Sequence, residues 1–154
     1  MSKLTVTMPS DTEIRMERTF DAPKRLLIQA MSTPELIVRW LGGKRGTVKV
    51  AAFDFRVGGS YRYEFKTHEG YEFSFSGTFE TITDDTIVFT EAFNDMPGAA
   101  IVTATYREAG GVTTMTVTSK FPSQEVRDMV AGTGMADGAG ESYDVLADLV
   151  RSMK

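Results

Sequence analysis

The sequence predicts an α+β fold in which a curved antiparallel sheet of six to seven strands wraps around one long C-terminal helix. Residues 13–20 alternate between apolar and polar side chains, which is the period-two pattern of a half-buried strand. Six further strand-like segments joined by short turns fill residues 47–120, and strands joined so closely must be antiparallel neighbours. Residues 135–153 then repeat apolar side chains at three- and four-residue spacing, which indicates an amphipathic helix facing the sheet.

Shorter helices are expected on both sides of the main run of strands. After the first strand, Asp21 is expected to cap a short helix whose first turn holds Pro23, and a second short helix follows it. After the last strand, Ser123 is expected to begin another short helix. Gly132 and Gly134 then separate this helix from the long one.

The length and composition fit one domain with a core of its own. The chain has 154 residues, of which 42% are hydrophobic and 25% charged, as in ordinary globular proteins. Residues 13–154 are expected to form a single domain. Residues 1–12 are polar and are expected to form a flexible N-terminal segment.

Composition also excludes several classes of partner. The net charge is −4, and no basic cluster exceeds the pair Lys44 and Arg45, which argues against nucleic acid. No apolar run reaches the length of about 18 residues that a membrane-spanning helix needs, so no membrane partner is expected. Cysteine is absent, which excludes disulfides and thiolate metal sites and favours a cytoplasmic location.

No cofactor or metal site is expected. The glycine pairs at 42–43 and 58–59 lack the spacing of phosphate-binding or nicotinamide-binding loops, and the second pair is expected to form a turn. The one histidine, His68, lies in a predicted turn without the further ligands that a metal requires or the partners of a catalytic imidazole.

The predicted arrangement leaves a space between the helix and the sheet. One helix is about 10 Å wide and cannot cover a sheet of six or seven strands by itself. The gap must therefore be closed by curvature of the sheet, by the short helices or by a ligand. Two successive strands can present seven aromatic rings to this space: Tyr61, Tyr63, Phe65, Tyr71, Phe73, Phe75 and Phe79.

Small residues on the long helix face the same space. Gly138, Ala139 and Gly140 stand where a densely packed helix would carry larger side chains, and each helical glycine costs about 1 kcal/mol relative to alanine. Two interpretations are open. Either the helix backbone packs closely against aromatic rings, or the small residues leave room for a guest.

Glu91 is the ionisable residue of greatest interest. It alternates with Phe89 and Phe93, so it is either a buried carboxylate or a residue at the rim of the sheet. A buried carboxylate would need a raised pKa or a cationic partner such as Arg18 or Arg62.

Three other residues also have two interpretations each. Asp54 and Arg56 are expected to form a structural ion pair, and the alternative is a pair of polar anchors at the pocket mouth. Trp40 is expected to pack in the core, and the alternative is a gate at the cavity entrance.

A series of motifs resembles the START-like (SRPBCC) superfamily. Within it, the pattern is most similar to the C-terminal domain of the heat-shock-protein-90 ATPase activator. The order of the motifs is specific, although no single motif is. They are Phe20-Asp21-Ala22-Pro23; Thr33-Pro34-Glu35-Leu36 with Arg39-Trp40; residues 54–62; Phe75-Ser76-Gly77; Thr90-Glu91-Ala92-Phe93; and residues 132–135 with Gly138 and Ser142-Tyr143.

The resemblance implies a helix-grip (START-like) fold and, across the superfamily, a cavity that binds hydrophobic small molecules. A minority of such relatives are enzymes, among them polyketide aromatase/cyclases. The co-chaperone activity belongs to longer members with an additional N-terminal domain. Leu41 and Gly43 stand where the family often has a second Trp and a Pro, and Ala139 where it often has a bulkier residue. Both departures are expected to widen the pocket, so no ligand can be carried over from a relative.

These observations predict a non-enzymatic protein that binds a small hydrophobic molecule, aromatic or lipid-like, between the sheet and the C-terminal helix. One alternative is a co-chaperone-like interaction module with a chaperone partner or a homodimer contact. The other is an aromatase/cyclase-type enzyme that uses Glu91; no catalytic residue is assigned. The expected ligand-binding residues are Trp40, Tyr61, Tyr63, Phe65, Phe73, Phe75, Phe89, Glu91, Met135, Ala139 and Tyr143.

Overall fold

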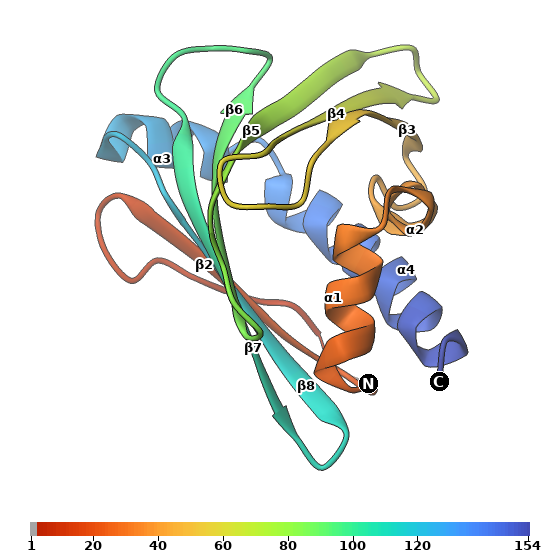
Figure 1. Cartoon of the computed structure of the whole chain (residues 1–154). Coiled ribbons are helices and arrows are strands. Elements are labelled where there is room, and N and C mark those ends of the chain that lie inside the picture. The colour runs from red at the N-terminus through yellow and green to blue at the C-terminus, as the bar shows by residue number, and fades with distance from the viewer. Residues whose placement is uncertain (1–2) are drawn as a thin grey trace.

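The computed structural model describes residues 3–154, and these form one eight-stranded sheet and four helices (Figure 1). The strands are β1 (Thr5–Thr7), β2 (Glu13–Phe20), β3 (Gly46–Phe53), β4 (Ser60–Thr67), β5 (Glu72–Ile82), β6 (Thr86–Phe93), β7 (Ala100–Ala109) and β8 (Val112–Lys120). The helices are α1 (Lys24–Ser32), α2 (Pro34–Trp40), α3 (Gln124–Ala131) and α4 (Met135–Ser152).

The sheet is antiparallel throughout, in the order β1-β2-β8-β7-β6-β5-β4-β3. β2 and β3 are consecutive strands along the chain, separated by α1 and α2, yet they lie near opposite edges of the sheet. The two short helices therefore cross from one side of the sheet to the other. In Figure 1 the sheet curves around α4, and α1 and α2 lie on the same side of the sheet as α4.

The alternation in the sequence sets the faces of the strands. In β2, Ile14, Met16, Arg18 and Phe20 are buried while the residues between them are more exposed. In β7, Val102, Ala104 and Tyr106 are buried in the same way. Of these inward side chains, Met16 and Phe20 of β2 and all three of β7 pack with residues of α4 in a single apolar core. The α4 residues are Leu146, Leu149 and Val150. Burial of this continuous apolar face holds the sheet on the helix.

The turn expected at Gly58 and Gly59 is present. Gly58 has a φ of 85°, and a Cβ on Gly59 would lie 2.1 Å from the carbonyl oxygen of Asp54, so only glycine fits there. The amide of Gly58 donates to the carbonyl of Phe79 at 2.8 Å, and the amide of Phe79 donates to Gly59 at 2.9 Å. The loop thus folds back onto β5 and brings Phe55 against the rings of Phe53 and Phe79.

The strand count is slightly higher than predicted. The extra strand is β1, which pairs antiparallel with residues 15–17 of β2. It lies in the segment 1–12 for which no strand was expected. Residues 1–2 of that segment lie outside the described residues. The three residues of β1 are all exposed, and the alternation of Thr5, Val6 and Thr7 is too short to distinguish a strand from a polar tail.

The prediction that Asp21 caps the first helix is wrong. Helix α1 begins at Lys24, and its N-cap residue is Pro23, which has no side chain that can cap it. The amide of Lys24 instead donates to the carboxylate of Glu108 on β7 at 2.8 Å. Asp21 lies too far upstream and instead faces Lys154 at the C-terminus, with 3.4 Å between Nζ and the carboxylate oxygen. The cap expected for α3 is confirmed, because the Ser123 hydroxyl accepts a hydrogen bond from the amide of Val126 at 3.2 Å.

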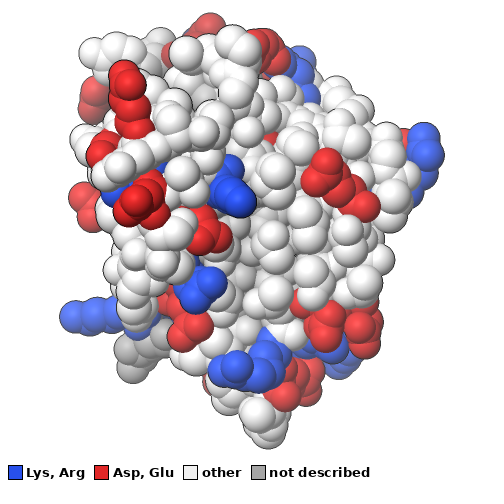
Figure 2. Space-filling view, turned by 90° about the vertical axis from the view of Figure 1, so that its left-hand side faces the viewer, with Lys and Arg blue, Asp and Glu red and all other residues white. Residues whose placement is uncertain are grey.

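Charges are mixed over the surface. Figure 2 shows acidic and basic side chains interspersed on one face, with uncharged surface between them. None of the helices in residues 3–154 is long and apolar enough to cross a membrane.

Candidate ligand-binding cavity

A cavity of about 540 Å³ lies between α4 and the concave face of the sheet. Its wall is formed by residues of β2 to β8, of α1, α2 and α4, and of the turns beside them. This volume falls within the range of about 300–1,000 Å³ that is usual for small-molecule sites. The core side chains therefore leave a substantial space between the helix and the sheet.

All eleven residues that the sequence analysis expected to contact a ligand lie on the cavity wall. α2 contributes Trp40, the three strands β4, β5 and β6 contribute seven residues, and α4 contributes the rest. The strand residues are Tyr61, Tyr63, Phe65, Phe73, Phe75, Phe89 and Glu91, and the helix residues are Met135, Ala139 and Tyr143.

Tyr71 is the one ring of the predicted set of seven that does not line the cavity. It is 68% exposed and precedes the first residue of β5. Its backbone amide donates to the hydroxyl of Thr67 at 3.0 Å, so Tyr71 belongs to the β4–β5 turn. The sequence pattern predicted that the strand begins at Tyr71, one residue before β5 does, and outside a strand side chains no longer alternate between faces.

The sequence analysis missed the part of the wall that lies nearest β2. β7 contributes Val102, Ala104 and Tyr106, and β8 contributes Val117 and Ser119. The alternation in both strands is clear, and it could have identified the inward residues. What it cannot show is that these strands stand opposite the tyrosines of β4, because this depends on how far the sheet curls.

Aromatic rings form two groups along the wall. Near the β4–β5 turn, Phe65 stacks on Phe73 at 4.8 Å between ring centroids and meets Phe75 edge-on at 5.6 Å. Deeper in the sheet, Tyr61 contacts Tyr63 at 5.0 Å and Phe79 at 5.4 Å. The sheet side of the wall is therefore lined by aromatic rings that pack against one another.

Gly138 leaves free space on the helix side. It lies on the cavity wall, and a Cβ added there would meet only Arg45, at 3.7 Å from the guanidinium. Gly140 lies off the cavity wall, and a Cβ there would meet only Leu4, at 4.0 Å. Neither glycine allows a close approach of the backbone to an aromatic ring. Of the two interpretations of these small residues, the structure favours room for a guest at Gly138.

Trp40 combines a core position with a place on the wall. It is only 6% exposed, and its indole N–H donates to the backbone carbonyl of Ala30 at 3.0 Å. Its ring lies 6.3 Å from the ring of Tyr143 on α4. The hydrogen bond and the burial support the core interpretation over a movable gate.

Glu91 lies inside, on the cavity wall, together with Phe89 and Phe93. Burial among rings raises the pKa of its carboxyl from 4.5 to about 7, because few groups stabilise the charged form there. Glu91 is half-buried, and its place on the cavity wall favours the interpretation as an inward carboxylate over the rim interpretation.

Tyrosines surround this carboxyl group. Burial, and to a smaller extent the charge of Glu91, raises the pKa of three tyrosine hydroxyls: those of Tyr61 and Tyr63 on β4 and of Tyr143 on α4. The hydroxyl of Tyr61 donates to the backbone carbonyl of Thr90 at 2.7 Å. Within residues 3–154, the hydroxyls of Tyr63 and Tyr143 have no hydrogen-bond partner, and both residues lie on the cavity wall.

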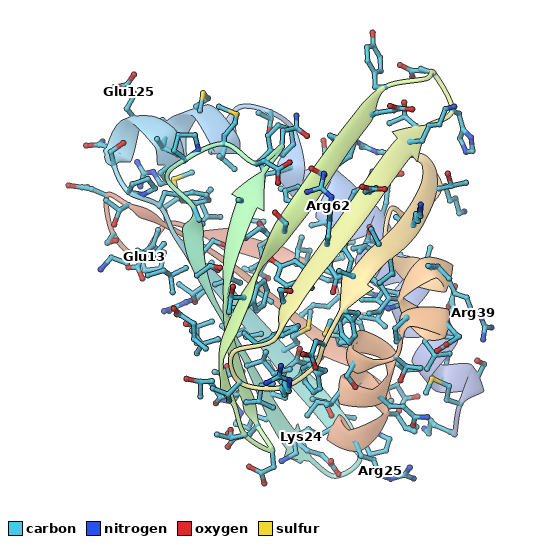
Figure 3. All side chains as sticks on the ribbon, turned by 45° about the horizontal axis from the view of Figure 1, so that its top comes forward. Glu13, Lys24, Arg25, Arg39, Arg62 and Glu125 are labelled. Carbon is cyan, nitrogen blue, oxygen red and sulfur yellow. The ribbon has the colours of Figure 1, made fainter. Side chains whose placement is uncertain are left out.

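The two cations proposed as partners of Glu91 are engaged elsewhere. Arg62 pairs with Glu64 at 3.0 Å and with Asp95 at 2.8 Å. Figure 3 shows Arg62 on the face of the sheet turned away from α4. Arg18 is buried, lies off the cavity wall and pairs with Asp144 of α4 at 2.5 Å.

The remaining polar candidates are placed outside the cavity. Arg56 and Asp54 form the expected ion pair, at 2.7 Å, and neither lies on the cavity wall. His68 is exposed, with its ring Nε2 3.1 Å from the carbonyl oxygen of Lys44. In the part of the chain that the structure describes, no group of three or more His, Cys, Asp or Glu side chains is placed to hold a metal ion.

The sequence profile of one protein family, described as "Activator of Hsp90 ATPase homolog 1-like protein", matches residues 21–151. This match spans α1, α2 and α3, the strands β3 to β8 and nearly all of α4. The chain belongs to this family. A comparison with curated proteins gave no significant match.

Solved structures of bacterial proteins share the fold of this family member over nearly its whole length. A protein from Rhodobacter sphaeroides is 22% identical with a TM-score of 0.89, and covers 97% of this chain and 99% of its own. Protein Ms6760 from Mycobacterium smegmatis is 20% identical with a TM-score of 0.88, and the match covers 98% of this chain and 99% of Ms6760. Protein CV1439 from Chromobacterium violaceum is 26% identical with a TM-score of 0.79, and the match covers 93% of this chain and 98% of CV1439.

The departures of this chain from the family pattern have different effects. Leu41 and Ala139 lie on the cavity wall, where they shape the space. Gly43 does not lie on that wall, so its expected widening of the pocket is wrong. Gly43 has a φ of 59°, and a Cβ there would meet Glu141 of α4 at 3.1 Å. It instead allows the α2–β3 turn to pack on α4, where the amide of Gly42 donates to Ser142 at 3.1 Å.

Proposed function

We propose that this member of the family binds a small hydrophobic molecule in the cavity between α4 and β4–β6. The observation that carries the proposal is the unfilled volume of about 540 Å³, which the aromatic rings of the sheet and the small residues of the helix leave open. A void of this size in a folded protein forfeits dispersion contacts that a guest would restore.

The composition of the wall supports an apolar guest. Most lining residues are aromatic or aliphatic, and burial of apolar surface yields about 25 cal/mol per Å². The eleven predicted residues are the proposed contacts. Trp40, Met135 and Tyr143 approach the guest from the helices, and the rings of β4 to β6 approach it from the sheet.

The test uses 1-ethylnaphthalene, an uncharged bicyclic hydrocarbon without a hydrogen-bonding group. We expect it to bind with a micromolar dissociation constant, to raise the melting temperature, and to shift the amide NMR signals of residues on α4 and β4–β6. If neither the melting temperature nor these signals respond up to the solubility limit, the proposal is wrong.

A matched pair of variants locates the binding site. Gly138→Leu directs a side chain into the cavity, whereas Gly140→Leu places the same side chain on α4 away from it. We expect Gly138→Leu to weaken binding of the hydrocarbon at least tenfold and Gly140→Leu to leave it within about twofold, since only the first occupies the guest's volume. Equal binding by both variants would place the hydrocarbon elsewhere.

The family match also supports a second candidate, a chaperone-interaction module in the cytoplasm. The outer face of β4 and β5 carries Arg62 in ion pairs with Glu64 and Asp95, a polar surface without a buried aromatic anchor of the kind that dominates binding energy. Pull-down with a purified heat-shock-protein-90 homologue tests this candidate. Retention at micromolar concentration would support it, and no retention would contradict it.

A further inference from the structure

Resting on the proposed function, we propose that the cavity selects amphipathic ligands in which an apolar, ring-containing body carries one protonated amine, with Glu91 as its counter-ion. The first observation is that Glu91 is a carboxylate without a partner. No hydrogen bond or ion pair joins it to another of the described residues, although it lies on the wall of an apolar cavity.

The other charged side chains on the cavity wall do not act as counter-ions to Glu91. The only other charged side chains on the wall are Arg45 and Lys66, both largely exposed to solvent. Arg45 is held by Glu141 of α4 at 2.6 Å. No cation among the lining residues therefore neutralises Glu91, and a ligand can supply the missing charge.

The two free hydroxyls complete a site for an ammonium group. Tyr63 from β4 and Tyr143 from α4 interact electrostatically with Glu91 from opposite walls of the cavity. An ammonium group has three N–H donors and no acceptor. Its donors can be shared among the carboxylate and the two hydroxyl oxygens, while the rings around them contact the apolar body and favour a cation over their faces.

The same arrangement discriminates against anions. A ligand carboxylate would either face Glu91 as a like charge or require Glu91 to take up a proton, and both reduce affinity. An uncharged hydrocarbon gains the apolar contacts but leaves the carboxylate without a partner. The expected order of affinity is therefore amine, then hydrocarbon, then carboxylate.

Three compounds with one ring system test this order: 1-naphthylmethylamine, 1-ethylnaphthalene and 1-naphthylacetate. At pH 8 we expect the amine to bind at least tenfold more tightly than the hydrocarbon, as a charge-assisted hydrogen bond contributes about 1.5–3 kcal/mol. The carboxylate is expected to bind more weakly than the hydrocarbon. NMR titration gives all three dissociation constants.

Two variants identify the source of the preference. Glu91→Gln keeps the shape of the side chain and removes its charge, and we expect it to bind amine and hydrocarbon within about threefold of one another. Glu80→Gln is the control, because it changes the net charge equally at an exposed site of β5 off the cavity wall. It is expected to keep the full preference for the amine.

A pH series supplies an independent readout. The groups that interact with Glu91 are the tyrosines of β4 and α4, and burial and the charge of Glu91 raise the pKa of each hydroxyl above its usual range. Among these groups, Glu91 is the one that changes charge between pH 6 and 8. Amine binding is expected to weaken about tenfold from pH 8 to pH 6 in the native protein and to stay constant in Glu91→Gln.

The outcomes separate this inference from the function on which it rests. Binding of the hydrocarbon without a preference for the amine would overturn the inference and leave the proposed function standing. A preference for the carboxylate, or one for the amine that survives Glu91→Gln, would also overturn the inference. Failure of all three compounds to bind would contradict the proposed function itself.

Discussion

For Glu91, the sequence indicated the possible positions of the side chain but not its surroundings. Its alternation with Phe89 and Phe93 left two positions open, inside the cavity or at the rim of the sheet, and the structure places it on the cavity wall. Its partners could not be predicted, because Arg18 and Arg62 are brought to their own carboxylates by strand register and by the packing of α4. Arg18 and Asp144 are 126 positions apart in the chain, and no local pattern reveals such a contact.

The pKa of Glu91 predicts a pH dependence of stability. The carboxyl ionises at about pH 4.5 in the unfolded chain and at about 7 in the folded protein. Between these values the unfolded state loses its proton first, so the free energy of unfolding falls as the pH rises from 4.5 to 7 and levels off above. The shift corresponds to at most about 3 kcal/mol, and water in the cavity reduces the expected effect to about 1–2 kcal/mol.

Urea denaturation of Glu91→Gln at pH 4.5 and pH 8 measures this effect. At each pH we take the free energy of unfolding of the variant minus that of the native protein. This difference is expected to be about 1–2 kcal/mol larger at pH 8 than at pH 4.5, because glutamine carries no charge to desolvate. Glu80→Gln, exposed on β5, should show no such difference. If the free energies of unfolding of Glu91→Gln and of the native protein change equally with pH, burial does not raise the pKa of Glu91.

Arg18 presents the opposite case, a buried cation with one partner. Its side chain is 2% exposed, and its Nε lacks a hydrogen-bond partner, while Asp144 is largely exposed. Asp144→Asn should cost about 1–3 kcal/mol, because it leaves a buried charge unpaired, and Arg18→Met should cost less. The control Asp148→Asn breaks a surface pair with Arg151 and should cost under about 0.5 kcal/mol. Urea denaturation that ranks Arg18→Met as the most costly change would contradict this account.

At the scale of elements, α4 shows how a helix can pack on a sheet and still leave a cavity. Its C-terminal half is anchored by Leu146, Leu149 and Val150, which are buried in the core. Its N-terminal half presents Gly138 and Ala139 to the cavity. The helix is thus secured at one end and sparsely packed at the other, where the guest is proposed to lie.

This division predicts that alanine is tolerated in the N-terminal half of α4. Gly138→Ala and Gly140→Ala should each raise the free energy of unfolding by about 0.5–1 kcal/mol, because both Cβ atoms have room and alanine favours a helix. Gly43→Ala should destabilise, since Gly43 has a positive φ and its Cβ would crowd α4 at 3.1 Å. Thermal denaturation compares the three variants. Destabilisation by Gly138→Ala would mean that the helix backbone is closely packed at this position.

Most elements could be predicted from the sequence, because periodicity and turn residues are local signals. The exceptions have physical reasons. β1 is a strand only through its pairing with β2, and Asp21 resembles a cap although α1 begins three residues later, at Lys24. Tyr71 continues the alternation of β5 by coincidence, since Thr67 at the end of β4 holds its backbone in the turn.

At the scale of the whole molecule, the central feature is the mismatch between a broad sheet and a single helix. The sequence predicted the mismatch from the number of strands and the one long amphipathic segment. The opposite wall of β7 and β8 could not be predicted, because it depends on how far the sheet curls around α4. The curl brings Tyr106 and Val117 within one cavity with Tyr63 and Phe75.

A crystal structure of the protein grown with 1-bromonaphthalene would show whether the cavity holds an apolar guest, because anomalous scattering locates bromine independently of how the side chains are interpreted. The account predicts one strong anomalous peak between α4 and β4–β6, beside the rings of Tyr63 and Tyr143. A cavity closed by the protein's own side chains, with no anomalous peak inside it, would contradict the account.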